Sequence, residues 1–417
     1  MKKILLTVFI LAVALFVLGA CGGNDAPDVP QDDAVDEQAT PPGGVVLEPV
    51  VLRVSESHGG PGEFILEAGR RFTEQNPHIT IEFINIAADA AAGAIAADGP
   101  LGIGPDVFAA PHSQMGTLYA GGHILEVPGN IADRLRGDLF TSGIIALTHD
   151  STLLGYPIAM ETYALFYNRA LIASAHVPVY FEEVIEFSRL FAEDNPDRFG
   201  FVMSISAFYS TMFITADGNR LFGPYGTDPV NTNINSPVSV AGMEFFQSLR
   251  EVLDMDAGDL SSSFTDAAFT AGNAAMHITE SRNLSVFENL GVDFGVTAIP
   301  ALPSQLTPPA SFVEVRAMFV SAYTEHPAEA HAFAQFLVSS EMQHLRYEIT
   351  GELPSTVVPT DNHRVAGFFR QLEYAFPLPS IPQMGLFWPA MGVAVANIWN
   401  GMDVQEQLDI AHYAIVD

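Results

Sequence analysis

The chain has 417 residues, of which 49 are Asp or Glu and 17 are Lys or Arg, so its formal net charge at pH 7 is −32. This excess of acid excludes the basic surface that a nucleic-acid-binding protein needs. The single cysteine excludes a disulfide framework and metal sites built from cysteines.

The N-terminal segment has the pattern of a secretory signal. Two lysines precede an apolar run over residues 4–18, which has the length of a signal-peptide core and is short for a spanning helix. The run leads into LGAC, which is similar to the lipobox of bacterial lipoproteins. We therefore expect a signal peptide over residues 1–20 and lipid attachment at Cys21, which would hold the protein at the extracellular face of the cell membrane.

Residues 21–49 differ in composition from the rest of the chain. They are rich in Asp, Glu, Pro and Gly, and such a segment cannot bury enough apolar surface to offset the entropy lost on ordering. We expect a flexible acidic linker that carries the lipid anchor. The remainder, about residues 50–417, exceeds the size at which a single core stops growing, so two domains are expected.

The first part of this remainder alternates strands and helices. A strand is predicted over 50–55, a helix over 62–75, a strand within 78–86, and, after an alanine-rich helix, a short buried strand within 104–111. This order predicts a parallel sheet with helices on its faces. In open sheets of this type, ligands bind beyond the carboxyl ends of the strands.

The stretch PIAMETYALFYNR, within a strand predicted over 154–168, carries a carboxylate near its middle. A lone acid in a buried strand costs several kcal/mol unless it is hydrogen-bonded. Glu161 is therefore either satisfied by its neighbours or available to a ligand.

The second part of the chain repeats the pattern of helices and strands. Helices are predicted within 177–196 and from the N-cap Ser236, a helix ending near Gly272 precedes a strand, and 327–349 holds one or two helices. The sequence has no phosphate-binding loop, metalloprotease motif or hydrolase elbow, and its histidines are scattered. We expect no cofactor and no metal site.

Four segments, in order, resemble one family. They are LGYPIAMETYALFYNRALI (154–172), the stretch 267–303 that begins AAFTAGNAAMHIT, HPAEAHAFAQFLVSSEMQ (326–343) and IPQMGLFWPAMGVAVANIWNG (381–401). The family is the bacterial extracellular solute-binding protein family 1, in particular the maltose/maltodextrin-binding lipoproteins of ABC importers. The resemblance extends over most of residues 50–417.

The resemblance implies an α/β, two-lobed periplasmic-binding-protein-like fold. Two mostly parallel sheets with flanking helices would be joined by a hinge of crossing strands, with the ligand in the cleft. The chain would cross between lobes near residues 160, 316 and 365. The N-lobe would then comprise 50–160 and 316–364, and the C-lobe 161–315 and 365–417.

The resemblance also implies ligand-binding residues. Glu161 aligns with a carboxylate that binds sugar hydroxyls, and Tyr163 lies two residues on, on the same face of the strand. Trp388 takes the place of the main stacking tryptophan. Phe208 and Tyr209 fall where the family has a stacking tyrosine; on a strand they would point in opposite directions, so we expect only one to serve. The alternative for Glu161 is a structural acid bonded to the backbone of the crossover, and the alternative for Trp388 is an aromatic residue of a lobe core.

Other family positions have changed in this chain. An aromatic and an acidic position of the first lobe are occupied by Ala109 and His112, and a second stacking tryptophan is replaced by Arg282. These departures argue against maltose itself as the ligand. His112, Glu280 and Arg282 remain candidates to line the cleft.

We therefore predict a lipid-anchored binding protein, and not an enzyme, that captures a carbohydrate, a maltodextrin-type oligosaccharide by resemblance. It would act as a monomer and deliver this ligand to the permease subunits of an ABC importer. The alternatives are a binding protein for another sugar or a polyol, a secreted glycosidase with two catalytic carboxylates, and a surface lipoprotein with a structural role.

Overall fold

The computed structural model describes residues 47–303 and 305–416. The expected signal peptide, Cys21 and nearly all of the expected linker lie outside the described residues. From Glu48 onward the chain forms a compact unit. No helix within the described ranges is long and apolar enough to span a bilayer.

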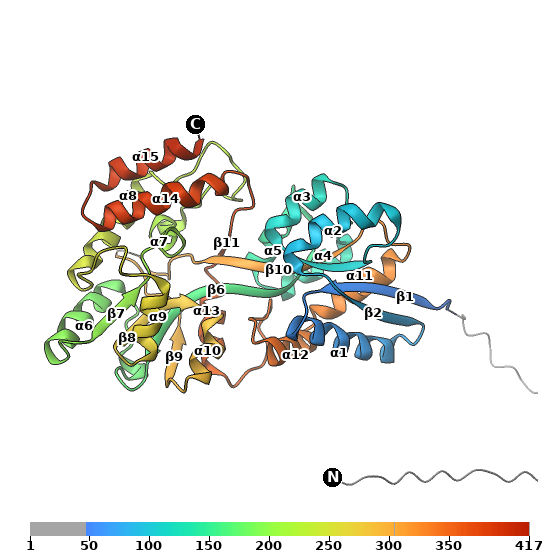
Figure 1. Cartoon of the computed structure of the whole chain (residues 1–417), viewed down its shortest axis with the longest axis horizontal. Helices are drawn as coiled ribbons and strands as arrows, with labels where there is room; N and C mark the ends of the chain where they lie inside the picture. The colour runs from blue at the N-terminus through green and yellow to red at the C-terminus, as the bar shows by residue number, and fades with distance from the viewer. Residues whose placement is uncertain (1–46, 304, 417) are drawn as a thin grey trace, which may run out of the picture. The chain divides into compact units, whose positions relative to one another are not determined.

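A mixed sheet of nine strands runs through this unit in the order β2-β1-β3-β10-β6-β8-β7, with β11 beside β10 and β9 beside β6 (Figure 1). Its strands are β1 (Val50–Glu56), β2 (Ile79–Asn85), β3 (Val107–Pro111), β6 (Tyr156–Asn168), β7 (Phe199–Met203), β8 (Ala274–Glu280), β9 (Phe294–Thr297), β10 (Phe312–Val320) and β11 (Phe376–Pro377). The short strands β4 (Thr148–His149) and β5 (Thr152–Leu153) pair separately. The predicted parallel pairing of the first three strands is confirmed, since β1 pairs in parallel with both β2 and β3.

Two strands, β6 and β10, join the two lobes (Figure 1). The first half of β6 pairs with β10, which also pairs with β3, while residues 163–168 of β6 pair with β8 and β9. The two sheets expected from the sequence are therefore continuous through these strands. Every antiparallel pair of the nine-stranded sheet involves β6 or β10, whereas the remaining pairs are parallel. The exact lobe boundaries stay a prediction.

Helices cover the sheet in both lobes. The first lobe contains α1 (Gly60–Gln75), α2 (Ala91–Asp98), α3 (Met115–Ala120), α4 (Gly129–Asp138), α5 (Thr141–Ala146), α11 (Pro327–Leu337) and α12 (Ser340–Thr350). The second contains α6 (Phe181–Asp194), α7 (Ala207–Ile214), α8 (Pro237–Ser248), α9 (Ser262–Thr270), α10 (Asn283–Asn289), α13 (His363–Leu372), α14 (Met384–Trp399) and α15 (Val404–Val416). Short 3-10 turns, including η1 (Ala88–Ala90), complete the connections.

Local sequence signals account for several helix ends. The hydroxyl of Ser236 accepts a hydrogen bond from the backbone N–H of Ser239 at 3.2 Å, so the predicted N-cap of α8 is confirmed. Helix α1 ends before Asn76, whose backbone and side-chain nitrogens both donate to Phe72 O. The segment predicted as one or two helices over 327–349 is two, α11 and α12.

Close packing of α7, α8 and α14 fixes one side of the hinge region. A Cβ at Gly242 of α8 would lie 2.0 Å from the carbonyl oxygen of Phe213 in α7, so only glycine permits this approach. Helix α14 packs on both α7 and α8. Its Trp399 is fully buried, contacts Phe246 with 5.1 Å between ring centroids, and donates its indole N–H to Met255 O.

A pair of glycine substitutions tests this packing. Gly242→Ala should lower the free energy of unfolding by about 1–3 kcal/mol, because α7 and α8 would have to separate. Gly392→Ala, on an exposed position of α14 where a Cβ would meet nothing within 4 Å, should raise it by about 0.5–1 kcal/mol through helix propensity. Urea denaturation of both variants measures these changes, and a tolerated Gly242→Ala would contradict the described packing.

Candidate functional site

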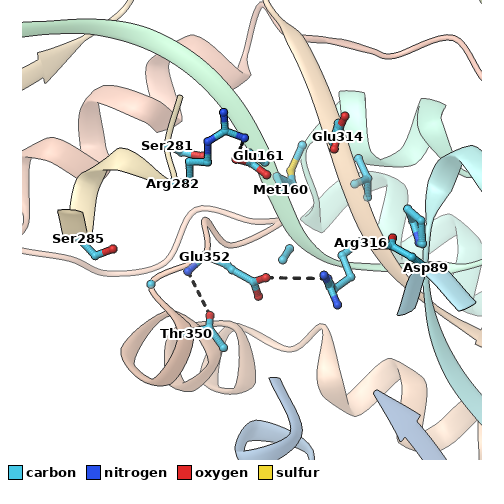
Figure 2. Close-up of a pocket in the computed structure, with 14 residues that line it drawn as sticks. Asp89, Met160, Glu161, Ser281, Arg282, Ser285, Glu314, Arg316, Thr350 and Glu352 are labelled. Carbon is cyan, nitrogen blue, oxygen red and sulfur yellow. Dashed lines mark hydrogen bonds and ion pairs between the residues drawn. The ribbon is translucent and has the colours of Figure 1, made fainter. Parts of the chain in front are cut away.

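A cavity of about 410 Å³ lies beside β6 and β10, where these two paired strands pass from one lobe to the other. Its walls come from β6, β10, the end of β8 with the start of α10, the segment after α12, and η1 (Figure 2). The lining residues are Asp89, Pro111, Ala159, Met160, Glu161, Ser281, Arg282, Ser285, Glu314, Val315, Arg316, Thr350, Gly351 and Glu352. Carboxylates, guanidinium groups and hydroxyls thus dominate its polar surface.

Glu161 is the one position of β6 that is not buried. Its register partner on β10 is another acid, Glu314, so both side chains lie on the same face of the sheet. One carboxylate oxygen of Glu161 is buried and has no hydrogen-bond partner among the described residues. The nearest cation, Arg282, lies 3.9 Å from that oxygen. Glu161 is therefore only partly satisfied by its neighbours.

Glu280 and Arg282 lie next to Glu161, and Arg282 lines the same cavity, whereas Glu280 is not among the lining residues. Glu280 ends β8 and is the register partner of Tyr163. Arg282 forms an ion pair with Glu280 and points toward Glu161 (Figure 2). The hydroxyl of Tyr209 donates to Glu280 at 3.4 Å. One guanidinium is therefore shared between two carboxylates.

The surroundings of Glu161 favour its protonated form. Burial, assisted by the negative charge of Glu280, raises its pKa from 4.5 to about 7, although Arg282 opposes the shift. Burial also raises the pKa of Glu280, again against the effect of Arg282. A carboxyl group that titrates near neutral pH at the floor of a cavity is a common property of a functional site.

The predicted aromatic residues form one cluster beside the cavity. Tyr163 is fully buried and contacts both Phe208 and Tyr209, with 5.2 Å between ring centroids in each case. Trp388 packs against Phe208 at 6.5 Å and against Phe312 of β10 at 6.2 Å. The cluster therefore connects the crossing strands with α7 and α14.

The expectation that Phe208 and Tyr209 lie on a strand is wrong, because both belong to helix α7. Adjacent residues of a helix diverge by about 100° rather than 180°, so both rings reach Tyr163. Tyr209 is buried, whereas Phe208 and Trp388 keep part of their surface exposed. None of the four predicted aromatic residues is among those that line the cavity, and Phe208 and Trp388 are the two with part of their surface exposed.

His112 does not line this cavity. It is 2% exposed, its Nε2 donates to Leu378 O at 2.9 Å, and its Nδ1 accepts the backbone N–H of Val315 at 3.1 Å. Burial lowers its pKa. His112 therefore ties β3 to β10 and β11 as a neutral imidazole. Neither His112 nor Tyr163 has a side-chain surface that a ligand could contact, because both are buried.

The sequence reasoning missed the first-lobe wall of the cavity. Arg316 of β10 donates to the fully buried Glu56 at 2.7 Å and lies 3.8 Å from Glu352 (Figure 2). The buried Arg346 bridges the same two acids. The signal that revealed Glu161, a charge within an apolar strand, is also present in FVEVRAMFV and would have identified Glu314 and Arg316.

Within the described ranges, no group of three or more His, Cys, Asp or Glu side chains is placed to hold a metal ion. The cavity has groups suited to hydrogen bonding with a polar ligand: the carboxylates, the two arginines and the hydroxyls of Ser281, Ser285 and Thr350.

The chain is similar to known solute-binding proteins in sequence and in structure. The family model described as bacterial extracellular solute-binding protein matches residues 56–344. Two relatives from Bacillus subtilis (strain 168) are a galactooligosaccharide-binding protein, 28% identical over 75% of this chain and 77% of the relative, and the maltodextrin-binding protein MdxE, 25% identical over 78% and 80%. An extracellular solute-binding protein from Staphylococcus aureus, solved in complex with maltose, shares the fold with a TM-score of 0.81 at 24% identity, covering 88% of this chain and 97% of that one.

The raised pKa of Glu161 predicts a pH-dependent effect of its replacement. The folded protein keeps a proton that the unfolded chain releases between pH 4.5 and about 7. The contribution of Glu161 to stability is therefore present below this window and is lost as the pH rises through it. The Glu161→Gln variant should gain stability relative to the wild type from about pH 5 to about pH 8, as measured by urea denaturation. Glu82→Gln, on the exposed outer strand β2, is the control, and a pH-independent difference for Glu161→Gln would contradict the interpretation.

Proposed function

Because the chain belongs to the bacterial extracellular solute-binding protein family, we propose that its solute is a carbohydrate, an oligosaccharide of the maltodextrin or galactooligosaccharide type. The names of the two Bacillus subtilis relatives support this ligand class. The family is one of solute-binding proteins rather than of enzymes, and we propose that this chain binds its ligand without altering it. Other sugars and polyols are the alternative ligands.

The observation that carries the proposal is the combination of an unsatisfied carboxylate in the cavity with partly exposed aromatic rings that pack on β6 and β10 outside the cavity lining. Sugars present hydroxyls at their edges and C–H groups on their faces. Glu161 has a carboxylate oxygen without a partner, which could accept a hydrogen bond from a sugar hydroxyl. Phe208 and Trp388 would offer flat surfaces for the sugar rings.

The two walls of the cavity also suggest how ligand binding would favour closure of the lobes. Glu161, Ser281 and Arg282 line one side, and Asp89, Arg316 and Glu352 line the other. A ligand that bridges them gains contacts only when the lobes approach, so it stabilises the closed state. We propose that the closed form is the one that the permease subunits of an ABC importer recognise. The name of a Streptococcus pneumoniae relative, a maltooligosaccharide ABC transporter solute-binding lipoprotein, supports a role with such an importer.

We further propose that Cys21 carries a lipid that holds the protein, as a monomer, at the outer face of the cell membrane. The LGAC sequence after an apolar run supports this proposal, as does the lipoprotein relative.

Ligand binding can be measured through the two tryptophans of the chain. Trp399→Phe leaves Trp388 as the only tryptophan. We expect maltotriose or a galactooligosaccharide to change its fluorescence, because a stacked sugar would alter the surroundings of the partly exposed ring. In calorimetry, Trp388→Ala should weaken binding by about tenfold or more, as loss of an aromatic platform does for other flat ligands.

The matched control for fluorescence is Trp388→Phe, which leaves only the buried Trp399. The tryptophan fluorescence of this variant should not change when ligand is added. A flat calorimetric response of the wild type to every sugar tested would contradict the carbohydrate proposal, and an unchanged affinity of Trp388→Ala would return Trp388 to a structural role.

Lipid attachment can be tested by fractionation. The Cys21→Ser variant, expressed in a lipoprotein-processing bacterium, should leave the membrane fraction, because no thiol remains to be acylated. The wild type should stay with membranes and incorporate labelled fatty acid. Membrane retention of both forms would overturn the proposal.

A further inference from the structure

The cavity contains more negative than positive charge. Its acids are Asp89, Glu161, Glu314 and Glu352, and its cations are Arg282 and Arg316. Each cation is shared with an acid outside this set: Arg282 pairs with Glu280 as well as Glu161, and Arg316 with Glu56 as well as Glu352. Among the described residues, Asp89 and Glu314 form no ion pair. The excess of negative charge therefore lies within the cavity itself.

The excess of negative charge is concentrated where β6 and β10 pair between the lobes. Glu161 and Glu314 are register partners on the open face of β6 and β10, and like charges directly opposite each other in a sheet repel. The Arg282 guanidinium lies 3.9 Å from Glu161 but is shared with Glu280. One oxygen of Glu161 is buried without a hydrogen bond. The other charged groups around this pair are Glu280, Arg316 and Glu352.

A bound cationic group would resolve this arrangement. A primary ammonium carries three N–H donors in a compact charge, so one such group can donate to both carboxylates at once. Hydrogen bonds between an ammonium and a carboxylate are about twice as strong as neutral ones. A ligand carboxylate or phosphate in the same place would add a further negative charge. Burial is the main cause of the raised pKa of Glu161, and the negative charges of Glu280, Glu314 and Glu352 add to it.

We propose that the cavity selects carbohydrates by charge: Glu161 and Glu314 together favour sugars that carry a protonated amino group over their neutral counterparts, and disfavour sugars that carry a carboxylate or phosphate. The inference rests on the proposed function, because it assumes that a carbohydrate occupies this cavity. Under this proposal Glu314 is a specificity-determining residue, and its side chain forms no hydrogen bond or ion pair with another described side chain.

The test is calorimetric titration at pH 7 with charge-matched sets of trisaccharides. For maltotriose and for a galactotriose, the neutral parent is compared with derivatives that carry an amino group at the 2- or the 6-position, and with the 6-carboxylate. We expect at least one amino derivative to bind about tenfold more tightly than its parent and the carboxylate to bind about tenfold more weakly.

Glu314→Gln should reduce the preference for the amino derivative over the neutral parent several-fold, because it removes one of the two carboxylates that face the ammonium. Glu82→Gln removes the same charge on strand β2 outside the cavity and should leave the preference unchanged. An equal loss in both variants would assign the preference to net charge and overturn the role of Glu314.

The outcomes separate this inference from the proposed function. If a neutral trisaccharide binds but no amino derivative binds more tightly, the charge preference is overturned while the carbohydrate proposal stands. If none of the neutral, amino or carboxylate sugars binds, the proposed function itself fails, and the inference fails with it.

Discussion

The structure depends on the antiparallel pairing of two strands that pass between its lobes. β6 is thirteen residues long, and twelve of these are buried. β10 lies beside its first half, and β8 and β9 lie beside its second half. The backbone hydrogen bonds of both lobes therefore continue through a single ladder. Polar side chains on the open face of this ladder line a cavity that both lobes complete, so the hinge and the candidate binding site are made of the same residues.

The first-lobe wall of that site is held by buried charges. Glu56 is fully buried, and it is stabilised by Arg316 from the crossing strand and by Arg346 from α12. Burying these ions is costly, and removing one partner would leave an unpaired charge in the core. The same network contacts Glu352 at the rim of the cavity. The orientation of Arg316 is thus fixed before any ligand arrives.

Much of the fold followed from local pattern, and part of the site did not. The periodicity of residues 50–111 predicted β1, α1, β2 and β3, and the charge inside an apolar strand identified Glu161. Helix α7 was missed because AFYSTMFI is apolar at most positions and has no clear period. The Glu56–Arg346 pair joins residues 290 positions apart, which no local pattern reveals. His112 was expected in the cleft from the resemblance. The sequence could not correct this expectation, because only tertiary contacts show that both of its ring nitrogens are hydrogen-bonded to backbone.

The contact of α7 with β6 has a kinetic consequence. Phe208 and Tyr209 both rest on Tyr163, and Tyr209 also holds Glu280, which in turn holds Arg282. These contacts join the aromatic cluster, the Arg282 guanidinium and strand β6 into one packed unit. A ligand would meet a finished half-site in the open protein and form an encounter complex there. Its rate of association would be set by this half-site, and its residence time by the rate at which the opposite wall withdraws.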